Sequence, residues 1–212
     1  NFPDILTVEG KYQFKPPLPF IPGTEVSGVV SKLGKGVTAR QVGDEVVGMV
    51  QLGGFASQVV ASEYTTFLKG SSMSFEQAAG FAVTYGTSYY ALKQKAQLQP
   101  GETVLVLGAA GGVGIATIQI AKAMGATVIA AASTEEKLDF ACKAGADLRI
   151  NYSTDNLKEK VKELTKGKGA DVIYDPVGGD FSEQAFRAIA WDGRFLVIGF
   201  ASGPIPKMPL NL

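Results

Sequence analysis

The 212-residue sequence contains no histidine and only one cysteine. A conventional zinc site is therefore nearly excluded, because such sites draw their ligands from histidine, cysteine and carboxylate side chains. Nucleophilic catalysis by serine–histidine or cysteine–histidine pairs is excluded outright. A disulfide within the chain is impossible, which is consistent with a reducing compartment. We therefore expect no metal ligands.

An excess of charge of one sign and a long apolar run are also absent. Lys plus Arg and Asp plus Glu both number 20, so we expect neither a nucleic acid nor a membrane as partner. No apolar run reaches the roughly 18 residues of a membrane span. The sequence begins at Asn1 rather than Met, so a targeting segment would not be visible. We expect a longer parent chain in a soluble cytoplasmic or organellar compartment.

The sequence changes its pattern near residue 80, which predicts domains over residues 1–80 and 81–212. Short β-prone runs separated by glycine and proline fill the first part and predict an irregular all-β segment. These runs are Glu25–Val30, Glu45–Val50 and Ala56–Val60. Ser74-Phe-Glu-Gln77 fits a capping box that opens a helix, and a second helical stretch covers Thr84–Lys95.

From Thr103 onward, β-strand and α-helix patterns alternate. Expected strands cover residues 103–108, 127–132, 147–151, 171–175 and 194–199, and expected helices cover residues 113–124, 135–144, 157–165 and 181–190. This alternation predicts right-handed crossovers and a parallel sheet covered by helices on both faces. The predicted fold class is thus α/β, with a Rossmann doubly wound sheet and an irregular all-β domain.

A glycine-rich turn, Gly108-Ala-Ala-Gly-Gly-Val-Gly114, follows the first strand of this series. Ala109 stands where the first glycine of a G-x-G-x-x-G turn usually lies, and the neighbouring Gly108 can supply the tight turn instead. Gly111 would let the backbone approach a pyrophosphate, and Gly114 would let the helix pack closely on the strand. The turn therefore predicts a dinucleotide site. The expected contacts are Ala110, Gly111, Gly112 and Val113.

The second strand of the series ends in Ile129-Ala-Ala-Ala-Ser133, without an acidic residue. In an NAD site, this strand usually ends in Asp or Glu, which binds the ribose hydroxyls. Here a 2′-phosphate would meet no repulsion, and Ser133, Lys137 and Tyr152 could bind it. The sequence therefore favours NADPH over NADH as cofactor. The alternative for Lys137 is a solvated helix residue.

The run Gly101-Glu-x-x-Leu105, continued by the glycine turn and Gln119-x-x-Lys122, resembles the signature of the quinone oxidoreductase and ζ-crystallin branch of the medium-chain dehydrogenase/reductases. Three further motifs extend the resemblance along the chain: Pro22-Gly-Thr-Glu-x-x-Gly28, Val42-Gly-Asp-Glu-Val46 and Asp175-Pro-Val-Gly-Gly179. The resemblance implies a partial GroES-like β domain and a Rossmann domain that lacks its last strands. It also implies that the parent chain forms a homodimer.

In the zinc-containing members of this superfamily, two cysteines and one histidine hold the catalytic metal. The positions that look equivalent here are Asn1, Thr24 and Ala79, and none of them can replace its ligand. The resemblance therefore implies zinc-free hydride transfer from NADPH to a quinone or an activated α,β-unsaturated carbonyl. The alternatives are an enoyl-thioester reductase and a non-catalytic NADPH-binding protein, either crystallin-like or a subunit of a complex.

The resemblance also implies roles for particular residues. Asn1 and Tyr12 would contact the substrate, with Tyr12 the better candidate proton donor; the alternatives are a loop residue and a surface aromatic. On the cofactor side, Thr87 would lie near the nicotinamide, its alternative being an ordinary helix cap. Contacts from the loops after the fourth and fifth strands would come from Val177, Gly178, Phe200, Ala201 and Ser202, with a core position as the alternative for Phe200.

Overall fold

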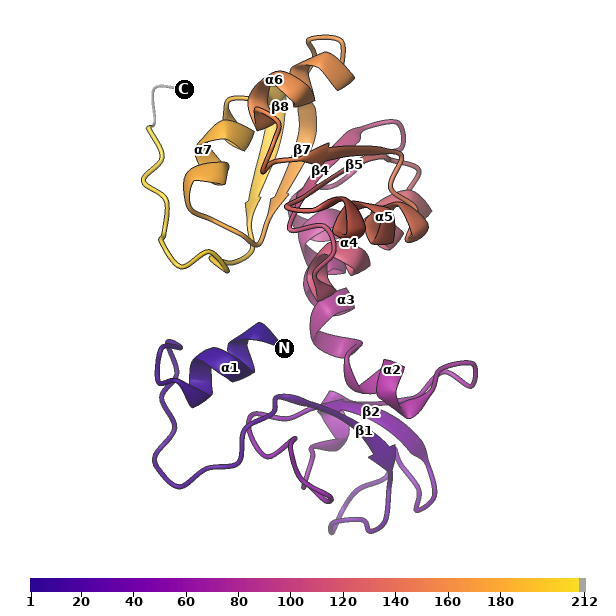
Figure 1. Ribbon diagram of the computed structural model, residues 1–212. Coiled ribbons are helices and arrows are strands. Elements are labelled where there is room, and N and C mark those ends of the chain that lie inside the picture. The colour runs from indigo at the N-terminus through magenta and orange to yellow at the C-terminus, as the bar shows by residue number, and fades with distance from the viewer. Residues whose placement is uncertain (210–212) are drawn as a thin grey trace. The chain divides into compact units, whose positions relative to one another are not determined.

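The computed structural model describes residues 1–209 of the protein (Figure 1). Its contacts divide the chain into two compact units, the first covering Asn1–Gly86 and the second starting at Thr87. This division falls inside helix α3 (Ala82–Tyr89), whereas the boundary predicted from the sequence lies just before that helix. No helix within residues 1–209 has the length and apolar character needed to cross a membrane.

The first unit contains a three-stranded antiparallel sheet in the order β1-β2-β3. Its strands are β1 (Glu25–Val29), β2 (Glu45–Met49) and β3 (Thr66–Leu68), and its short helices are α1 (Phe2–Val8), η1 (Glu63–Thr65) and α2 (Phe75–Ala79). The capping box predicted at Ser74 is present, since the Ser74 hydroxyl accepts a hydrogen bond from the Gln77 backbone N–H. The first two predicted strands and this helix are therefore confirmed.

Two expectations for the first unit are wrong. The run Ala56–Val60 forms no strand and is exposed throughout. Within the described residues, no strand pairs with this run. Residues with a high β propensity form a strand only where their side chains can pack against a neighbouring strand. Helix α1 was not predicted because Ile5, Thr7 and Val8 are β-branched. Its capping box at Asn1 nevertheless marks a helix start.

The second unit is built on a five-stranded parallel sheet in the order β6-β5-β4-β7-β8. The strands are β4 (Thr103–Leu107), β5 (Thr127–Ala132), β6 (Leu148–Asn151), β7 (Ala170–Asp175) and β8 (Ile189–Val197). The connecting helices are α4 (Gly112–Ala123), α5 (Glu135–Lys143), α6 (Leu157–Leu164) and α7 (Asp180–Phe186). This order, with a reversal at β4, confirms the predicted Rossmann doubly wound sheet.

Both faces of this sheet are buried, as the continuous apolar runs predicted. Successive β4 side chains alternate between two cores: Val104 and Val106 belong to one, and Leu105 and Leu107 to the other. Helices α4 and α5 cover the first face, and α6 and α7 cover the second (Figure 1). The four side chains are fully buried, so β4 and the turn that follows it rest on a rigid base.

Two predicted helices have different ends in the structure. The helix expected over residues 181–190 ends at Phe186, and β8 begins at Ile189 rather than Arg194. A short apolar segment such as the one around Ile189 is compatible with a buried helix and with a buried strand. In the structure it is a strand, because Ile189 pairs with Ala170 of β7. The helix expected over residues 84–95 becomes a π-helix, η2, over Tyr90–Lys95.

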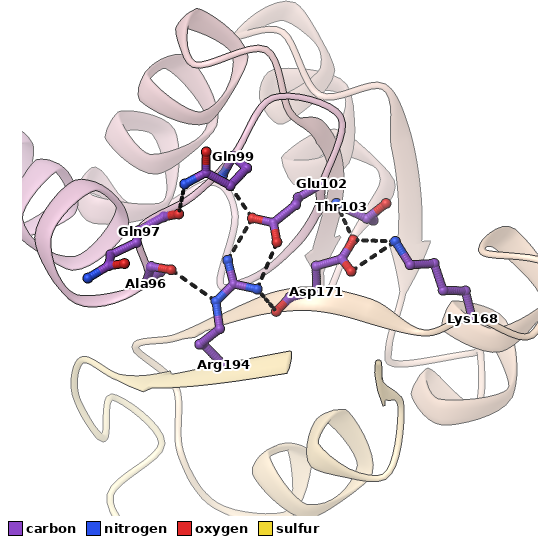
Figure 2. Close-up of polar contacts among 8 residues, drawn as sticks. All are labelled: Ala96, Gln97, Gln99, Glu102, Thr103, Lys168, Asp171 and Arg194. Carbon is purple, nitrogen blue, oxygen red and sulfur yellow. Dashed lines mark hydrogen bonds and ion pairs between the residues drawn. The ribbon is translucent and has the colours of Figure 1, made fainter. Parts of the chain in front are cut away.

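A charged network joins the strands at the edge of the sheet where β4 and β7 begin (Figure 2). The Arg194 guanidinium of β8 donates two hydrogen bonds to Glu102, at 2.6 and 2.9 Å. It also donates to the carbonyl oxygens of Ala96, at 2.9 Å, and Asp171, at 3.2 Å. The Asp171 carboxylate accepts a 2.8 Å hydrogen bond from the Thr103 backbone N–H. This network lies at the opposite edge from the glycine turn, which follows the carboxyl end of β4.

Candidate cofactor site

The glycine turn connects β4 to α4 at the carboxyl edge of the parallel sheet. The Ala109 N–H donates to the Ala131 carbonyl of β5 at 3.1 Å, and the Gly111 N–H donates to the Gly108 carbonyl at 2.9 Å. Gly108 has a φ of +57°, a conformation that favours glycine. The tight turn therefore lies at Gly108, one position before the usual first glycine, as the sequence predicted.

Helix α4 starts unusually close to the strand that precedes it. A Cβ at Gly114 would lie 2.5 Å from the Gly108 carbonyl oxygen and 2.7 Å from that of Ala109, so only glycine fits. Gly111 is the N-cap and has no side chain to accept hydrogen bonds from the first helical N–H groups. Those groups can bind an anion, because the helix dipole also favours negative charge there. This turn contains the four predicted contacts Ala110, Gly111, Gly112 and Val113.

A buried polar cluster, which the sequence analysis missed, supports the first turn of α4. The Ser88 hydroxyl donates to the Val113 carbonyl at 3.1 Å and lies 3.1 Å from the Tyr174 hydroxyl. The Thr117 hydroxyl donates to Ser88 at 3.0 Å. Burial raises the pKa of Tyr174 above its ordinary value of 10.0, which keeps the hydroxyl neutral. The cluster thus ties α4 to α3 and β7 without any charge.

The three residues predicted to read a 2′-phosphate lie together at the carboxyl end of β5. The Lys137 ammonium donates to the Ser133 hydroxyl at 3.1 Å, and the Tyr152 backbone N–H donates to the carbonyl of Ala132, the residue before Ser133, at 3.1 Å. Burial raises the pKa of Tyr152 above 10.0, so its hydroxyl remains a donor at neutral pH. The Tyr152 ring packs on Phe181, with ring centroids 4.3 Å apart. The cluster therefore offers an ammonium and two hydroxyls to an anion.

Two carboxylates begin α5 close to this cluster, namely Glu136, which precedes Lys137 in the sequence, and Glu135. The Glu135 Oε1 accepts a 2.8 Å hydrogen bond from the Asn151 amide, and its Oε2 lies 3.7 Å from the Arg149 guanidinium. Arg149 also pairs with Asp139 at 2.6 Å. Glu135 is thus engaged by neighbours on β6, and the end of β5 itself carries no acid.

The loops after β7 and β8 lie side by side at the same carboxyl edge. The Ala201 N–H donates to the Pro176 carbonyl at 3.1 Å, and the Ser202 N–H donates to the Val177 carbonyl at 2.9 Å. A Cβ at Gly178 would lie 3.0 Å from the Phe200 ring. The structure therefore brings together the predicted contacts Val177 and Gly178 with Phe200, Ala201 and Ser202.

Thr87, the remaining cofactor candidate, is half-buried on α3. It lines an open pocket of about 460 Å³ beside η2 and β8. The other lining residues are Tyr90, Ala91, Lys95, Phe195, Leu196, Val197 and Ile198. The structure thus places Thr87 beside the strand whose following loop contains Phe200.

In the first unit, Asn1 belongs to a cluster built around two buried carboxylates. Its side-chain amide donates to Glu25, which also accepts a 3.0 Å hydrogen bond from the Val83 backbone N–H. Asp4 accepts hydrogen bonds from the Thr24 hydroxyl at 3.1 Å and from the Asn1 backbone nitrogen at 2.7 Å. Burial raises the pKa of Glu25 above 4.5. Sequence reasoning missed Asp4 and Glu25 as members of this cluster, although the Gly-Thr-Glu motif contains Glu25.

This cluster does not fit zinc. Within residues 1–209, no three His, Cys, Asp or Glu side chains are grouped so that they could hold a metal ion. The Asn1 amide and the Thr24 hydroxyl are poor zinc ligands, and both are bonded to carboxylates. Ala79, at the end of α2, has no ligating atom.

Tyr12 lies in the loop after α1. Its side chain is 38% exposed, and its backbone N–H donates to the Leu6 carbonyl at 3.1 Å. No hydrogen bond joins its hydroxyl to Asn1 in the described part of the chain.

Comparisons with known proteins match both units. The family model of the alcohol dehydrogenase GroES-like domain matches residues 1–98, and that of the zinc-binding dehydrogenases matches residues 112–212. A GroES-like domain followed by such a nucleotide-binding domain defines the class of medium-chain dehydrogenase/reductases.

Individual relatives narrow this class. The quinone oxidoreductase-like protein 2 homolog of Nematostella vectensis is 48% identical, over 100% of this chain and 58% of that protein. The solved structure of Escherichia coli quinone oxidoreductase complexed with NADPH superposes on this chain with a TM-score of 0.92 and a sequence identity of 38%. The match covers 100% of this chain and 65% of the Escherichia coli chain. The solved structure of CurK enoyl reductase matches with a TM-score of 0.87 and a sequence identity of 34%. This match covers 94% of this chain and 62% of the CurK chain.

The chain belongs to the quinone oxidoreductase-like proteins of the medium-chain dehydrogenase/reductase superfamily. The family resemblance predicted from the sequence is thereby confirmed. The chain spans less than two thirds of the length of each of the three relatives, namely 58%, 65% and 62%.

Proposed function

We propose that the protein is an NADPH-dependent oxidoreductase that transfers a hydride to a quinone or an activated α,β-unsaturated carbonyl without zinc. One observation carries this proposal: the open N-terminus of α4 and the cluster of Ser133, Lys137 and Tyr152 follow adjacent strands at one edge of the sheet. Ligands of open α/β sheets bind at this edge. The NADPH complex of the Escherichia coli relative supports the same cofactor.

The cofactor would be held by two kinds of groups. The turn from Ala110 to Val113 and the first N–H groups of α4 would bind the pyrophosphate. Ser133, Lys137 and Tyr152 would bind the 2′-phosphate, since all three can donate hydrogen bonds. Val177 and Gly178, together with Thr87 and the loop from Phe200 to Ser202, would contact the rest of the molecule. When bound, NADPH supplies a hydride from C4 of its nicotinamide.

The acceptor would be contacted by Asn1 and Tyr12. Glu25 accepts a hydrogen bond from the Asn1 amide and so fixes its orientation, and the exposed Tyr12 hydroxyl would donate the proton that completes the reduction. The donor set around Asn1 does not fit zinc, so carbonyl polarisation would have to come from hydrogen bonds. That weaker activation favours acceptors that are already electron-poor. We further propose that the parent chain forms a homodimer in a soluble compartment.

The test is a titration of the full-length protein with NADPH and with NADH, followed by NADPH oxidation with a panel of quinones and enones. We expect tighter binding of NADPH and oxidation by at least one acceptor class. A protein that binds NADPH but oxidises it with none of the acceptors would be a non-catalytic NADPH-binding protein, and the proposed reductase activity would be wrong.

An enoyl-thioester reductase is the second candidate, and the similarity to CurK enoyl reductase favours it. The two candidates differ in their acceptor rather than in their cofactor. The same panel should therefore include enoyl thioesters of several chain lengths. A higher kcat/KM with a thioester than with every quinone would select this second function.

A further inference from the structure

Asp175 is a buried carboxylate at the last position of β7 that the proposed chemistry does not use. Its side chain is 3% exposed. Oδ1 accepts hydrogen bonds from the backbone N–H groups of Val177, at 2.8 Å, and Gly178, at 2.9 Å. Oδ2 accepts a 2.5 Å hydrogen bond from the Ser182 hydroxyl in α7. The carboxylate thus ties the loop after β7 to the helix that follows it.

The backbone of the same residue anchors the neighbouring loop. The Asp175 carbonyl accepts hydrogen bonds from the N–H groups of Ile198, at 2.9 Å, and Gly199, at 3.3 Å, at the end of β8. The next residues along the two loops are also joined by backbone hydrogen bonds, from the Ala201 N–H to the Pro176 carbonyl and from the Ser202 N–H to the Val177 carbonyl. One residue therefore holds both loops that carry proposed cofactor contacts.

The first of these loops needs such an anchor. Gly178 and Gly179 have φ values of +74° and +63°, and glycine loses more conformational freedom on ordering than any other residue. A Cβ at Gly179 would lie 2.6 Å from the Ser202 hydroxyl, so the two loops are packed closely. Hydrogen bonds that order the loop before binding spare the cofactor that entropic cost.

We propose that Asp175 is a positioning residue for NADPH, which fixes the loops after β7 and β8 through its carboxylate without contacting the cofactor itself. This inference rests on the proposed function and deepens it. It assigns part of the cofactor affinity to a side chain outside the set of contacting residues.

Substitutions in the full-length protein test this role, with the Kd for NADPH as the readout. Asp175→Ala removes three hydrogen bonds to the carboxylate, so the loop after β7 would have to be ordered on binding, and the Kd should rise about tenfold or more. Asp175→Asn keeps an oxygen for the two N–H groups and can donate to Ser182, so its Kd should stay within about threefold of the wild-type value.

Asp171 provides a matched control on the same strand. It is also a buried carboxylate, 7% exposed, and it accepts a backbone hydrogen bond from Thr103 at the opposite edge of the sheet. Asp171→Ala should lower Tm as Asp175→Ala does, yet leave the Kd for NADPH within about twofold. An equal rise in Kd for both alanine variants would overturn the proposal, and so would a failure of Asp175→Asn to restore affinity.

Two further readouts separate this inference from the proposed function. The ratio of NADH to NADPH affinity should change less than about twofold in Asp175→Ala, because Ser133 and Lys137, which include the only charge of the 2′-phosphate cluster, follow β5 rather than β7. If Asp175→Ala does not fold, Ser182→Ala removes only the 2.5 Å bond and should raise the Kd about threefold; an unchanged Kd would then refute the role. A wild-type protein that binds neither nucleotide would refute the proposed function instead.

Discussion

Replacement of Lys137 by alanine tests the choice between the two nucleotides. Its ammonium is the only positive charge in the cluster with Ser133 and Tyr152. A unit charge pair 4 Å apart interacts by about 1 kcal/mol in water and about 4 kcal/mol at a partly buried site. Lys137 is exposed, so the lower value applies, and a phosphate monoester carries a charge of about −1.5 to −2. The affinity for NADPH should therefore fall about tenfold to thirtyfold.

The assay compares the Kd values of NADPH and NADH at low ionic strength for the wild-type protein and Lys137→Ala. NADH has no 2′-phosphate, so its Kd should change less than about twofold. Lys143→Ala is the matched control, because this exposed lysine lies at the other end of the same helix. Raising the salt concentration should shrink the loss in NADPH affinity. Equal weakening of both nucleotides by Lys137→Ala would refute the assignment of the 2′-phosphate site.

Three other predictions follow from the structure. Gly114→Ala should lower Tm in scanning calorimetry and abolish NADPH binding, because its Cβ would lie 2.5 Å from the Gly108 carbonyl oxygen. Arg194→Lys loses the two-pronged bond to Glu102 and should destabilise the fold by about 1–2 kcal/mol in urea titrations at pH 7. Since the hydrogen bond from Arg194 lowers the pKa of Glu102 below 4.5, this difference should persist above pH 4.5 and fade as the pH falls further. Elemental analysis of the full-length protein should find no stoichiometric zinc, because the donors around Asn1 do not fit it.

The sequence predicted the second unit much better than the first. Strands buried on both faces produce long apolar runs such as Val104–Leu107, and the helices between them have a different period. In the first unit, the strands are short and only partly buried, so pattern carries less information. Helix α1 and the exposed run Ala56–Val60 were both misjudged for this reason.

The parts of the candidate site that could be predicted are local in sequence. The glycine turn and the acid-free end of β5 each occupy one short segment. By contrast, Ser88 and Tyr174 are 86 positions apart and meet only because α3 and β7 pack beside α4. Asp175 was visible within its motif, but its carboxylate could be recognised as an anchor only once the loop geometry was known.

The cluster around Asn1 also restricts the chemistry. Asp4 and Glu25 are buried carboxylates that accept hydrogen bonds from the side chains of Thr24 and Asn1, and Asp4 also pairs with the Asn1 amino group. Burial raises the pKa of Glu25, and the nearby Asp4 carboxylate adds to this effect, so further negative charge beside the two carboxylates is disfavoured. If Asn1 contacts the acceptor as proposed, a localised alkoxide would be repelled by the two carboxylates. Quinones and enones avoid this cost because they delocalise the negative charge that the hydride brings until a proton arrives.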